Sequence, residues 1–588
     1  MKGFFKIVFA SMVGFLLSFL AISLLFIFII IGIVASSEGE TVQVESNSVL
    51  HVTLDRPIVE RASKTPFDEL DVPGFESNKK LGLNDILAAI ERAKSDDNIK
   101  GIYLDVSGIQ AGMATTEEIR NALVDFKKSK KFIIAYSEVY TQGAYYLASV
   151  ADRIYLNPEG LLEFTGFSSQ ITFFKGTLEK LEIEPQVIKV GTYKSAVEPF
   201  ILDKMSDANR QQVSSFVGSM YEHFLQNVAA SRKIHRDSLF AIANQLKVQS
   251  AEDAVTHKLA DGLRYKDQII DELKKRIGIE KKEDIKAVSL ASYIKNNKPK
   301  PGDMNNRIAM VYASGEITGG EGDDETIGSE RISRAIRKAR TDEKVKAVVL
   351  RVNSPGGSAL ASDVIWREVA LTKKVKPVIV SMGDVAASGG YYIACAADSI
   401  FAEPNTITGS IGVFGIIPNM QKFFNNKLGI TFDGVKTAEH ADLGTVTRPL
   451  TDAERLIIQK EVNRIYNTFT KRVAEGRKKT QAYVDQIGQG RVWSGTEAQK
   501  NGLVDRLGNI DDAIRSAAKM AKLKDYKLVA YPAQRDPFES ILGSGQDKLK
   551  EHFAKLQLGE HYQYYNQLKS AMKFTGIQAR MPYTISIK

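Results

Sequence analysis

A long uncharged run opens the chain. Residues Ile7 to Val34 carry no charge and are mostly apolar, and about 20 such residues can cross a bilayer as a helix. Lysines precede the run at positions 2 and 6, and glutamates follow it at positions 38 and 40. Because positively charged flanks tend to stay cytoplasmic, we expect a membrane anchor with its N-terminus inside. The alternative is a signal peptide cleaved near Ala35, although apolar cores of signal peptides usually span only about 7–15 residues.

Helical and strand patterns alternate in the second half of the chain. Amphipathic stretches alternate with short apolar stretches: Ile332–Arg340 (helix), Lys346–Val352 (strand), Ser362–Leu371 (helix), Lys376–Met382 (strand), Gly389–Ala397 (helix) and Ser399–Pro404 (strand). This order is typical of a parallel α/β sheet covered by helices.

The same pattern occurs earlier in the chain, at a constant offset of 246 residues. Glu138–Pro158 reads EVYTQGAYYLASVADRIYLNP, and Asp384–Pro404 reads DVAASGGYYIACAADSIFAEP. The match continues without gaps back to about residue 83. A match of this length indicates duplication of a whole domain rather than a short-period solenoid.

The duplication and the changes in composition together suggest a domain organisation. A strand-like stretch lies at Val49–Glu60, and helical stretches close the copies at Asp207–Lys247 and Thr451–Arg477. We expect a cytoplasmic start and anchor over 1–36, a stalk with a first strand over 37–80, an N-terminal repeat over 81–294, a linker over 295–307, a C-terminal repeat over 308–532 and an extension over 533–588. No role is assigned to the extension, which has no counterpart in the first half.

Composition excludes several classes of function. The net charge is +9 over 588 residues, and no basic cluster with interleaved aromatic residues stands out, so nucleic-acid binding has little support. The single cysteine, Cys395, rules out intrachain disulfides and cysteine-rich metal sites. We interpret it as a small buried side chain, with a reactive thiol as the alternative. No cofactor or metal is predicted.

A glycine pair follows a predicted strand in VNSPGGSALAS (Val352–Ser362). Gly356 and Gly357 leave backbone N–H groups free to approach a ligand, as an oxyanion hole requires. The alternative is a tight turn without function. The aligned text of the first half, VSGIQAGMATT, lacks this Pro-Gly-Gly sequence.

Ser388 is the candidate nucleophile. It stands where a strand turns into a helix, and the first half has Gln142 at the aligned position although the surrounding residues are retained. A serine that only caps the helix is a common alternative. The loss of the serine in one copy, with its surroundings kept, favours a functional role.

A serine nucleophile needs a base, and two residues are candidates. His440 lies in a region where the repeat places chemistry, but no acidic partner in a recognisable motif accompanies it. Lys194, in VGTYKSAVEPF, is the better candidate, because burial disfavours the charged form of a lysine and lowers its pKa. A carboxylate nearby, such as Glu198, would oppose that shift. The alternative for Lys194 is an ordinary surface lysine.

These motifs resemble a known family. YKSAVEPF, SPGGS, AASGGYYIACAAD and WSGTEAQKNGLVDRLG are similar to the long form of signal peptide peptidase A (protease IV), a family of membrane-anchored Ser/Lys peptidases built from duplicated Clp-protease/crotonase-like domains. The resemblance covers roughly residues 1–530. It implies that Ser388 is the nucleophile, that Lys194 is the general base, and that Gly356, Gly357 and Gly389 supply the oxyanion hole.

The resemblance carries further expectations. Ser410, in TGSIGV, would orient the lysine, although a turn serine is the alternative. The family forms a tetramer and degrades signal peptides and other short apolar peptides at the outer face of the bacterial cytoplasmic membrane. Residues 7–34 would contact the bilayer, and the catalytic domains would be periplasmic.

Two other functions remain open on sequence alone. A crotonase-like acyl-CoA enzyme also polarises a carbonyl with paired N–H groups, but it needs neither Ser388 nor Lys194. A non-enzymatic membrane scaffold would be free to lose the serine or the glycine pair, and both are present.

Overall fold

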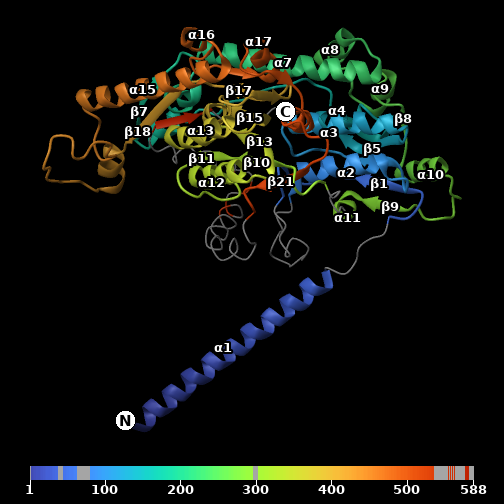
Figure 1. Cartoon of the computed structure of the whole chain (residues 1–588), viewed down its shortest axis with the longest axis horizontal. Helices are drawn as coiled ribbons and strands as arrows, with labels where there is room; N and C mark the ends of the chain where they lie inside the picture. The colour runs from blue at the N-terminus through green and yellow to red at the C-terminus, as the bar shows by residue number, and fades with distance from the viewer. Residues whose placement is uncertain are drawn as a thin grey trace.

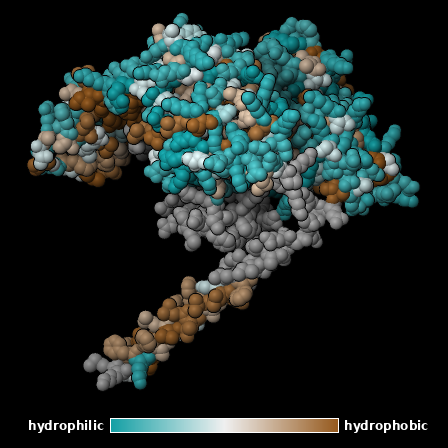
Figure 2. All heavy atoms as spheres, viewed as in Figure 1, coloured by the Kyte–Doolittle hydropathy of each residue, from teal (hydrophilic) through white to brown (hydrophobic). Residues whose placement is uncertain are grey.

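The computed structural model describes residues 2–37, 44–62, 80–295, 302–534 and 577–581, and four single residues between 554 and 562. About half of the predicted stalk and linker, and most of the predicted C-terminal extension, therefore lie outside the described residues. Helix α1 (Lys2–Ser37) contains the uncharged run, and Figure 2 shows the apolar residues along it. Within it, Gly3–Leu25 is long and apolar enough to cross a membrane, judged by length and composition.

The first half forms a six-stranded sheet in the order β8-β6-β5-β4-β1-β9, and every neighbouring pair is parallel. The strands are β1 (Ser48–Val52), β4 (Ile99–Asp105), β5 (Phe132–Tyr140), β6 (Arg153–Leu162), β8 (Gly262–Leu263) and β9 (Ala287–Ser289). A separate short pair joins β2 (Ile58–Val59) and β3 (Leu81–Gly82). The strand expected over Val49–Glu60 is thus two strands, β1 and β2.

The second half repeats this arrangement. Its sheet has the order β19-β17-β15-β13-β10-β21, with β16 and β20 attached beside β15. The strands are β10 (Arg307–Ser314), β13 (Val345–Ser354), β15 (Val378–Ala387), β16 (Ser399–Ala402), β17 (Ile407–Gly409), β19 (Val492–Ser494), β20 (Arg506–Leu507) and β21 (Lys527–Tyr531). All these pairs are parallel except β17 with β19. The predicted duplicated α/β fold is confirmed.

Helices cover both sheets. They are α2 (Leu83–Ser95), α3 (Met113–Phe126), α4 (Gln142–Ala148), α5 (Lys175–Lys180), α6 (Glu198–Ile201), α7 (Asp207–Arg232), α8 (Arg236–Asn244), α9 (Ala251–Thr256), α10 (Lys266–Ile277), α11 (Leu290–Lys295), α12 (Ser329–Thr341), α13 (Ala359–Lys373), α14 (Gly389–Ala394), α15 (Asp452–Arg477), α16 (Gln481–Ile487), α17 (Gly495–Lys500) and α18 (Ile510–Met520). The helical stretch expected over Asp207–Lys247 is two helices, because Lys233 ends α7 in the left-handed conformation. The long helices α7 and α15 run along one side of the molecule (Figure 1).

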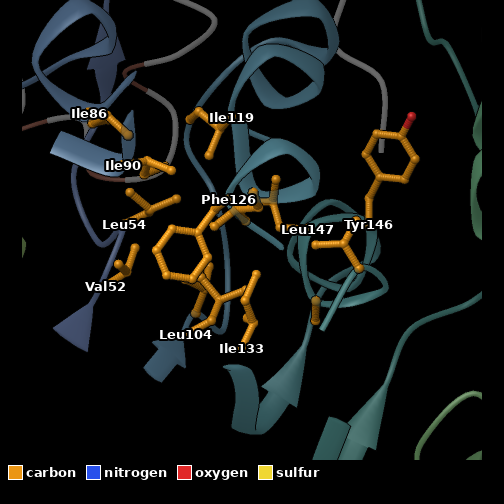
Figure 3. Close-up of a cluster of buried hydrophobic side chains, with 14 of the residues drawn as sticks. Val52, Leu54, Ile86, Ile90, Leu104, Ile119, Phe126, Ile133, Tyr146 and Leu147 are labelled. Carbon is orange, nitrogen blue, oxygen red and sulfur yellow. The ribbon is translucent and has the colours of Figure 1, made fainter. Parts of the chain in front are cut away.

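The core follows the apolar faces of these helices. Figure 3 shows side chains of α2, α3 and α4, among them Ile90, Phe126 and Leu147, pointing to residues of β1, β4 and β5. The same buried cluster continues into the second sheet, where it includes Met310 of β10 and Val349 of β13. One buried cluster therefore extends across both repeats, and the second repeat has a further cluster built mostly from its own residues.

A third sheet is built by both halves, which the sequence pattern did not predict. Its order is β12-β11-β14-β22-β18-β7, and the strands are β7 (Glu184–Val190), β11 (Glu316–Thr318), β12 (Thr326–Gly328), β14 (Gly356–Ser358), β18 (Val413–Asn419) and β22 (Ile577–Arg580). Strand β7 of the first half pairs antiparallel with β18 of the second half along its whole length, and the two lie side by side in Figure 1.

A buried ion-pair network also joins the halves. The guanidinium of Arg351 on β13 donates to the carboxylates of Glu60 (2.8 Å) and Glu118 on α3 (2.6 Å). The Arg351 side chain is fully buried, and the two carboxylates are almost fully buried. A buried pair tolerates removal of one partner poorly, because the other charge stays buried without compensation.

We expect Arg351→Met to lower the free energy of unfolding by about 3–5 kcal/mol, measured by urea denaturation. Arg464→Met is the matched control, since Arg464 pairs with Glu461 on the exposed surface of α15, and it should leave the midpoint nearly unchanged. Equal losses in the two variants would contradict this interpretation of Arg351.

Candidate active site

Ser388 lies in the turn between β15 and α14. Its backbone has φ 55° and ψ −112°, a conformation that residues other than glycine rarely adopt and that costs about 1–3 kcal/mol. Its Oγ makes no helix-capping hydrogen bond. Instead, Oγ lies 3.0 Å from Lys194 Nζ and 3.4 Å from the carbonyl oxygen of Gly412. The interpretation of Ser388 as a capping residue is therefore wrong.

Lys194 is fully buried, so it is not a surface lysine. Its Nζ also lies 3.1 Å from Ser410 Oγ and donates to the carbonyl oxygen of Ser410 at 3.3 Å. Burial lowers the pKa of the Lys194 ammonium well below its usual value, because desolvation disfavours the charged form. Glu198, the carboxylate expected to oppose this shift, accepts hydrogen bonds from Ser206 and Asn209 instead.

The third sheet brings Lys194 to Ser388. Lys194 follows β7 by four residues, and β7 is held against β18 of the second half. Two glycines leave room for the lysine. A Cβ on Gly490, whose φ is +78°, would lie 2.6 Å from both Lys194 N and Lys194 Cβ, and a Cβ on Gly412 would lie 3.1 Å from Lys194 Cδ. A side chain on Gly490 would therefore displace the lysine.

Gln212 on α7 locks the same segment in place. Its side-chain amide donates to the carbonyl oxygen of Tyr193 (3.1 Å) and to Ser195 Oγ (2.8 Å), and it accepts a hydrogen bond from the Val492 N–H (3.1 Å). The residues on both sides of Lys194 are thus tied to β19. The sequence offered no signal for Gln212, whereas Gly412 and Gly490 stand out only as glycines flanking short apolar stretches.

The predicted oxyanion-hole residues lie beside Ser388. A Cβ on Gly356, whose φ is +95°, would lie 2.7 Å from the Gly389 N–H nitrogen, so the glycine pair and the start of α14 are in close contact. The Gly356 N–H donates to Ser354 Oγ at 3.1 Å. The Gly356 N–H is therefore already hydrogen-bonded, and the lack of a side chain on Gly356 allows the close approach to Gly389. The N–H groups of Gly357 and Gly389 remain the candidate donors of the oxyanion hole.

Other candidates lie elsewhere or serve the fold. His440 is exposed, in a loop that follows β18, while the contact of Ser388 is with Lys194. Cys395 is fully buried and donates to the carbonyl oxygen of Tyr392, and burial raises the pKa of its thiol to about 12. This confirms a packing role for the cysteine.

The first repeat has lost the corresponding site. Gln142, which is aligned with Ser388, is the first residue of α4. Its side chain makes hydrogen bonds to nearby backbone groups. It accepts hydrogen bonds from the N–H groups of Thr165 and Gly166 and donates to the Gly166 carbonyl oxygen. Gln142 therefore stabilises the loop after β6, whereas the second repeat has the serine hydroxyl of Ser388 at the aligned position.

Comparisons with known proteins agree with this arrangement. The model of peptidase family S49 matches the chain twice, over residues 125–280 and 370–524. Protease 4 of Salmonella typhi is 41% identical over 472 residues, which cover 79% of this chain and 76% of that protein. The chloroplastic serine protease SPPA of Arabidopsis thaliana is 33% identical over 506 residues, 85% of this chain and 73% of that protein.

Protease 4 of Haemophilus influenzae is 36% identical over 515 residues, 84% of this chain and 83% of that protein. Two family matches, and relatives that align over most of both chains, agree with the duplicated fold. The chain therefore belongs to peptidase family S49 and is a serine peptidase.

Proposed function

We propose that Ser388 and Lys194 form a catalytic dyad in which the second half supplies the nucleophile and the first half the base. The carrying observation is the 3.0 Å contact between Lys194 Nζ and Ser388 Oγ inside a fully buried site. A general base must lie within hydrogen-bond reach of the proton it takes and have a pKa near the working pH. The geometry meets the first condition, and burial favours the second.

The surroundings orient the lysine for this task. A neutral amine has two N–H groups and one lone pair. The Ser410 carbonyl oxygen can only accept, and Ser410 Oγ is placed to accept the second N–H. The lone pair of Lys194 is then left to accept the Ser388 hydroxyl proton. Ser410 is thus proposed as the positioning residue.

The reaction then proceeds by acyl transfer. Lys194 takes the proton of Ser388 Oγ as Oγ attacks the carbonyl carbon of the peptide, and the Gly357 and Gly389 N–H groups stabilise the negative oxygen. Lys194 gives its proton to the departing amine. Water, activated by the same lysine, releases the acyl group. A crotonase-like acyl-CoA reaction would not require the contact between Ser388 and Lys194, so this contact favours the peptidase reaction.

We expect a serine-reactive acylating probe, such as an activated peptide ester, to label Ser388 in the wild type and to fail with Lys194→Ala, because the hydroxyl then lacks its base. Mass spectrometry of the labelled peptide measures this. Ser219→Ala is the control: it removes a hydroxyl that hydrogen-bonds to Ser494 at the end of β19, and this variant should be labelled normally. Equal labelling of Lys194→Ala would contradict the dyad.

We also propose that the enzyme is anchored in the bacterial cytoplasmic membrane with its catalytic halves outside, where it degrades cleaved signal peptides and other short apolar peptides. The uncharged run within α1 and its lysine-rich start support this orientation. The intact mass of the membrane-extracted protein should include residues 7–34. A mature start near Ser36 would show instead that the run is a cleaved signal peptide.

The homotetramer also remains a proposal. The loop after β18 exposes apolar side chains, including Phe432 at 52% and Val435 at 100%, and Figure 2 shows apolar residues gathered at that end of the molecule. Exposed apolar patches often mark contact surfaces, which supports association with further copies of the chain.

A further inference from the structure

Helix α7 places one glutamine between the two halves of the chain. Gln212 lies in the second turn of α7, and its side chain is fully buried. The next residue, Val213, belongs to an apolar cluster with Val492 of β19 and with Ala387. Ala387 directly precedes the nucleophile in the chain, so the backbone that carries Gln212 is fixed beside it.

The side-chain amide of Gln212 is hydrogen-bonded at both ends. Its nitrogen donates to the Tyr193 carbonyl oxygen (3.1 Å), Ser195 Oγ (2.8 Å) and Asn209 Oδ1 (3.0 Å), and its oxygen accepts the Val492 N–H (3.1 Å). A backbone carbonyl can only accept and a backbone N–H can only donate, so these partners fix which end of the amide is which. The nitrogen therefore faces the lysine segment, Tyr193–Ser195, and the oxygen faces β19.

These contacts connect Lys194 to Ser388 through a short series of neighbours. The residues directly before and after Lys194 are the two that Gln212 holds on one side. On the other side, Val492 lies opposite Gly409 in the β17–β19 pair. The Gly409 carbonyl oxygen accepts the N–H of Ser388 at 2.8 Å. Gln212 thus links the two halves around the site in which Nζ and Oγ lie 3.0 Å apart.

A backbone hydrogen bond also ties the lysine segment to the second half. The Tyr193 N–H donates to the Gln489 carbonyl oxygen at 2.8 Å, and this bond lies before Lys194. Gln212 adds a bond beyond it, at Ser195. Without the amide, the buried Ser195 hydroxyl and the buried Val492 N–H would both lose this partner, and buried polar groups are costly to leave unpaired. We therefore expect the lysine segment to shift when the amide is removed.

We propose that Gln212 is a positioning residue of the dyad, which holds Lys194 Nζ within hydrogen-bond reach of Ser388 Oγ by tying the lysine segment to β19. The inference rests on the proposed dyad, and Gln212 acts through Lys194 rather than on the substrate. A general base works only within hydrogen-bond reach of the proton that it takes, and a misplacement of about 1 Å lowers a rate by on the order of 100-fold. The amide therefore contributes to kcat rather than to substrate binding.

The same contacts keep the Lys194 amine away from water. Desolvation disfavours the ammonium and so lowers the pKa of Lys194. A lysine segment that is free to shift would let water reach Nζ, and this pKa would rise toward its usual value. Because only the neutral amine is a base, the alkaline rise of kcat/KM would then move to higher pH. A residue that only stabilised the fold would lower the number of active sites and leave the pH profile of the remaining sites unchanged.

Gln212→Met, compared with Gln211→Met, tests the proposal. Methionine keeps roughly the length of glutamine and removes its hydrogen bonds. Gln211 is the matched control, because it is the exposed neighbour of Gln212 and accepts the Tyr193 hydroxyl at the surface (3.1 Å). With a small peptide ester, and with active sites counted by the acylating probe, Gln212→Met should lose on the order of 100-fold in kcat. Its KM should stay close to that of the wild type, and its pH profile should move to higher pH. Gln211→Met should match the wild type in all three measurements.

Ser195→Ala is the milder second variant. It removes one acceptor of the Gln212 amide, and the loss of a single hydrogen bond should lower kcat by about 3- to 10-fold, with a pH shift of the same sign. In the Ser195→Ala background, Gln212→Met should cost less than in the wild type, because the two changes remove the same bond. If Gln212→Met does not fold, kcat and the pH profile of Ser195→Ala decide alone.

The outcomes separate this inference from the dyad. A pH profile that stays in place, kcat losses that add fully in the double variant, or an equal loss in Gln211→Met overturns the positioning role of Gln212. If Lys194→Met is inactive in the same assay, the dyad stands although the positioning role falls. A Lys194→Met enzyme with wild-type activity shows instead that the proposed dyad itself is wrong.

Discussion

Lys194→Met should reduce kcat/KM for a small peptide ester by on the order of 10⁴-fold, the upper end of what a general base contributes. Methionine has nearly the length of lysine and is apolar, so it suits a fully buried site but cannot accept the Ser388 proton. Lys194→Arg should be equally inactive, because a guanidinium keeps its proton in proteins. Lys194→His should retain at most a trace of activity.

The pH profile of the wild type tests the same residue. Only the neutral amine can act as a base, so kcat/KM should rise with pH through the pKa of Lys194 and then level off. Since burial lowers that pKa well below its usual value, the rise should lie closer to neutral pH than the pKa of about 10.4 of an ordinary exposed lysine. Lys189→Met, which changes a partly exposed lysine on β7, should keep the wild-type profile. Wild-type activity in Lys194→Arg would mean that the lysine is structural.

The second half alone, residues 307–588, should have no measurable peptidase activity. It lacks Lys194, its β18 has lost the partner strand β7, and Arg351 has lost both carboxylates. The core cluster shared by the two sheets would also be opened to water. Peptide-ester hydrolysis by the isolated half and by the full chain measures this.

A nicked chain provides the matched control. A protease site introduced between residues 296 and 301 should allow the chain to be cut without loss of activity, because the two halves stay paired through β7 and β18. If residues 307–588 alone were as active as the full chain, the base would lie within the second half, and His440 would be the first candidate to test.

Local pattern was sufficient for much of the fold. The β–α alternation predicted the strands and helices around Ser388, and the offset of 246 residues predicted the second, degenerate copy. Boundaries deviated by a few residues, as at α14, which ends at Ala394 rather than Ala397. Such ends depend on hydrogen bonds of single residues, which periodicity does not resolve.

The order of residues along the chain was enough to reveal the duplication, the anchor-like run and the position of Ser388, because each can be recognised by comparing one stretch of sequence with another or with its flanks. Three-dimensional packing places Lys194 at 3.0 Å from Ser388 and lets Gly490 make room for the lysine. It also decided that β22, from an extension to which the sequence assigned no role, lies against the glycine pair. Pairing between distant strands leaves no periodic signal along the chain, and a lysine's burial depends on every element packed around it.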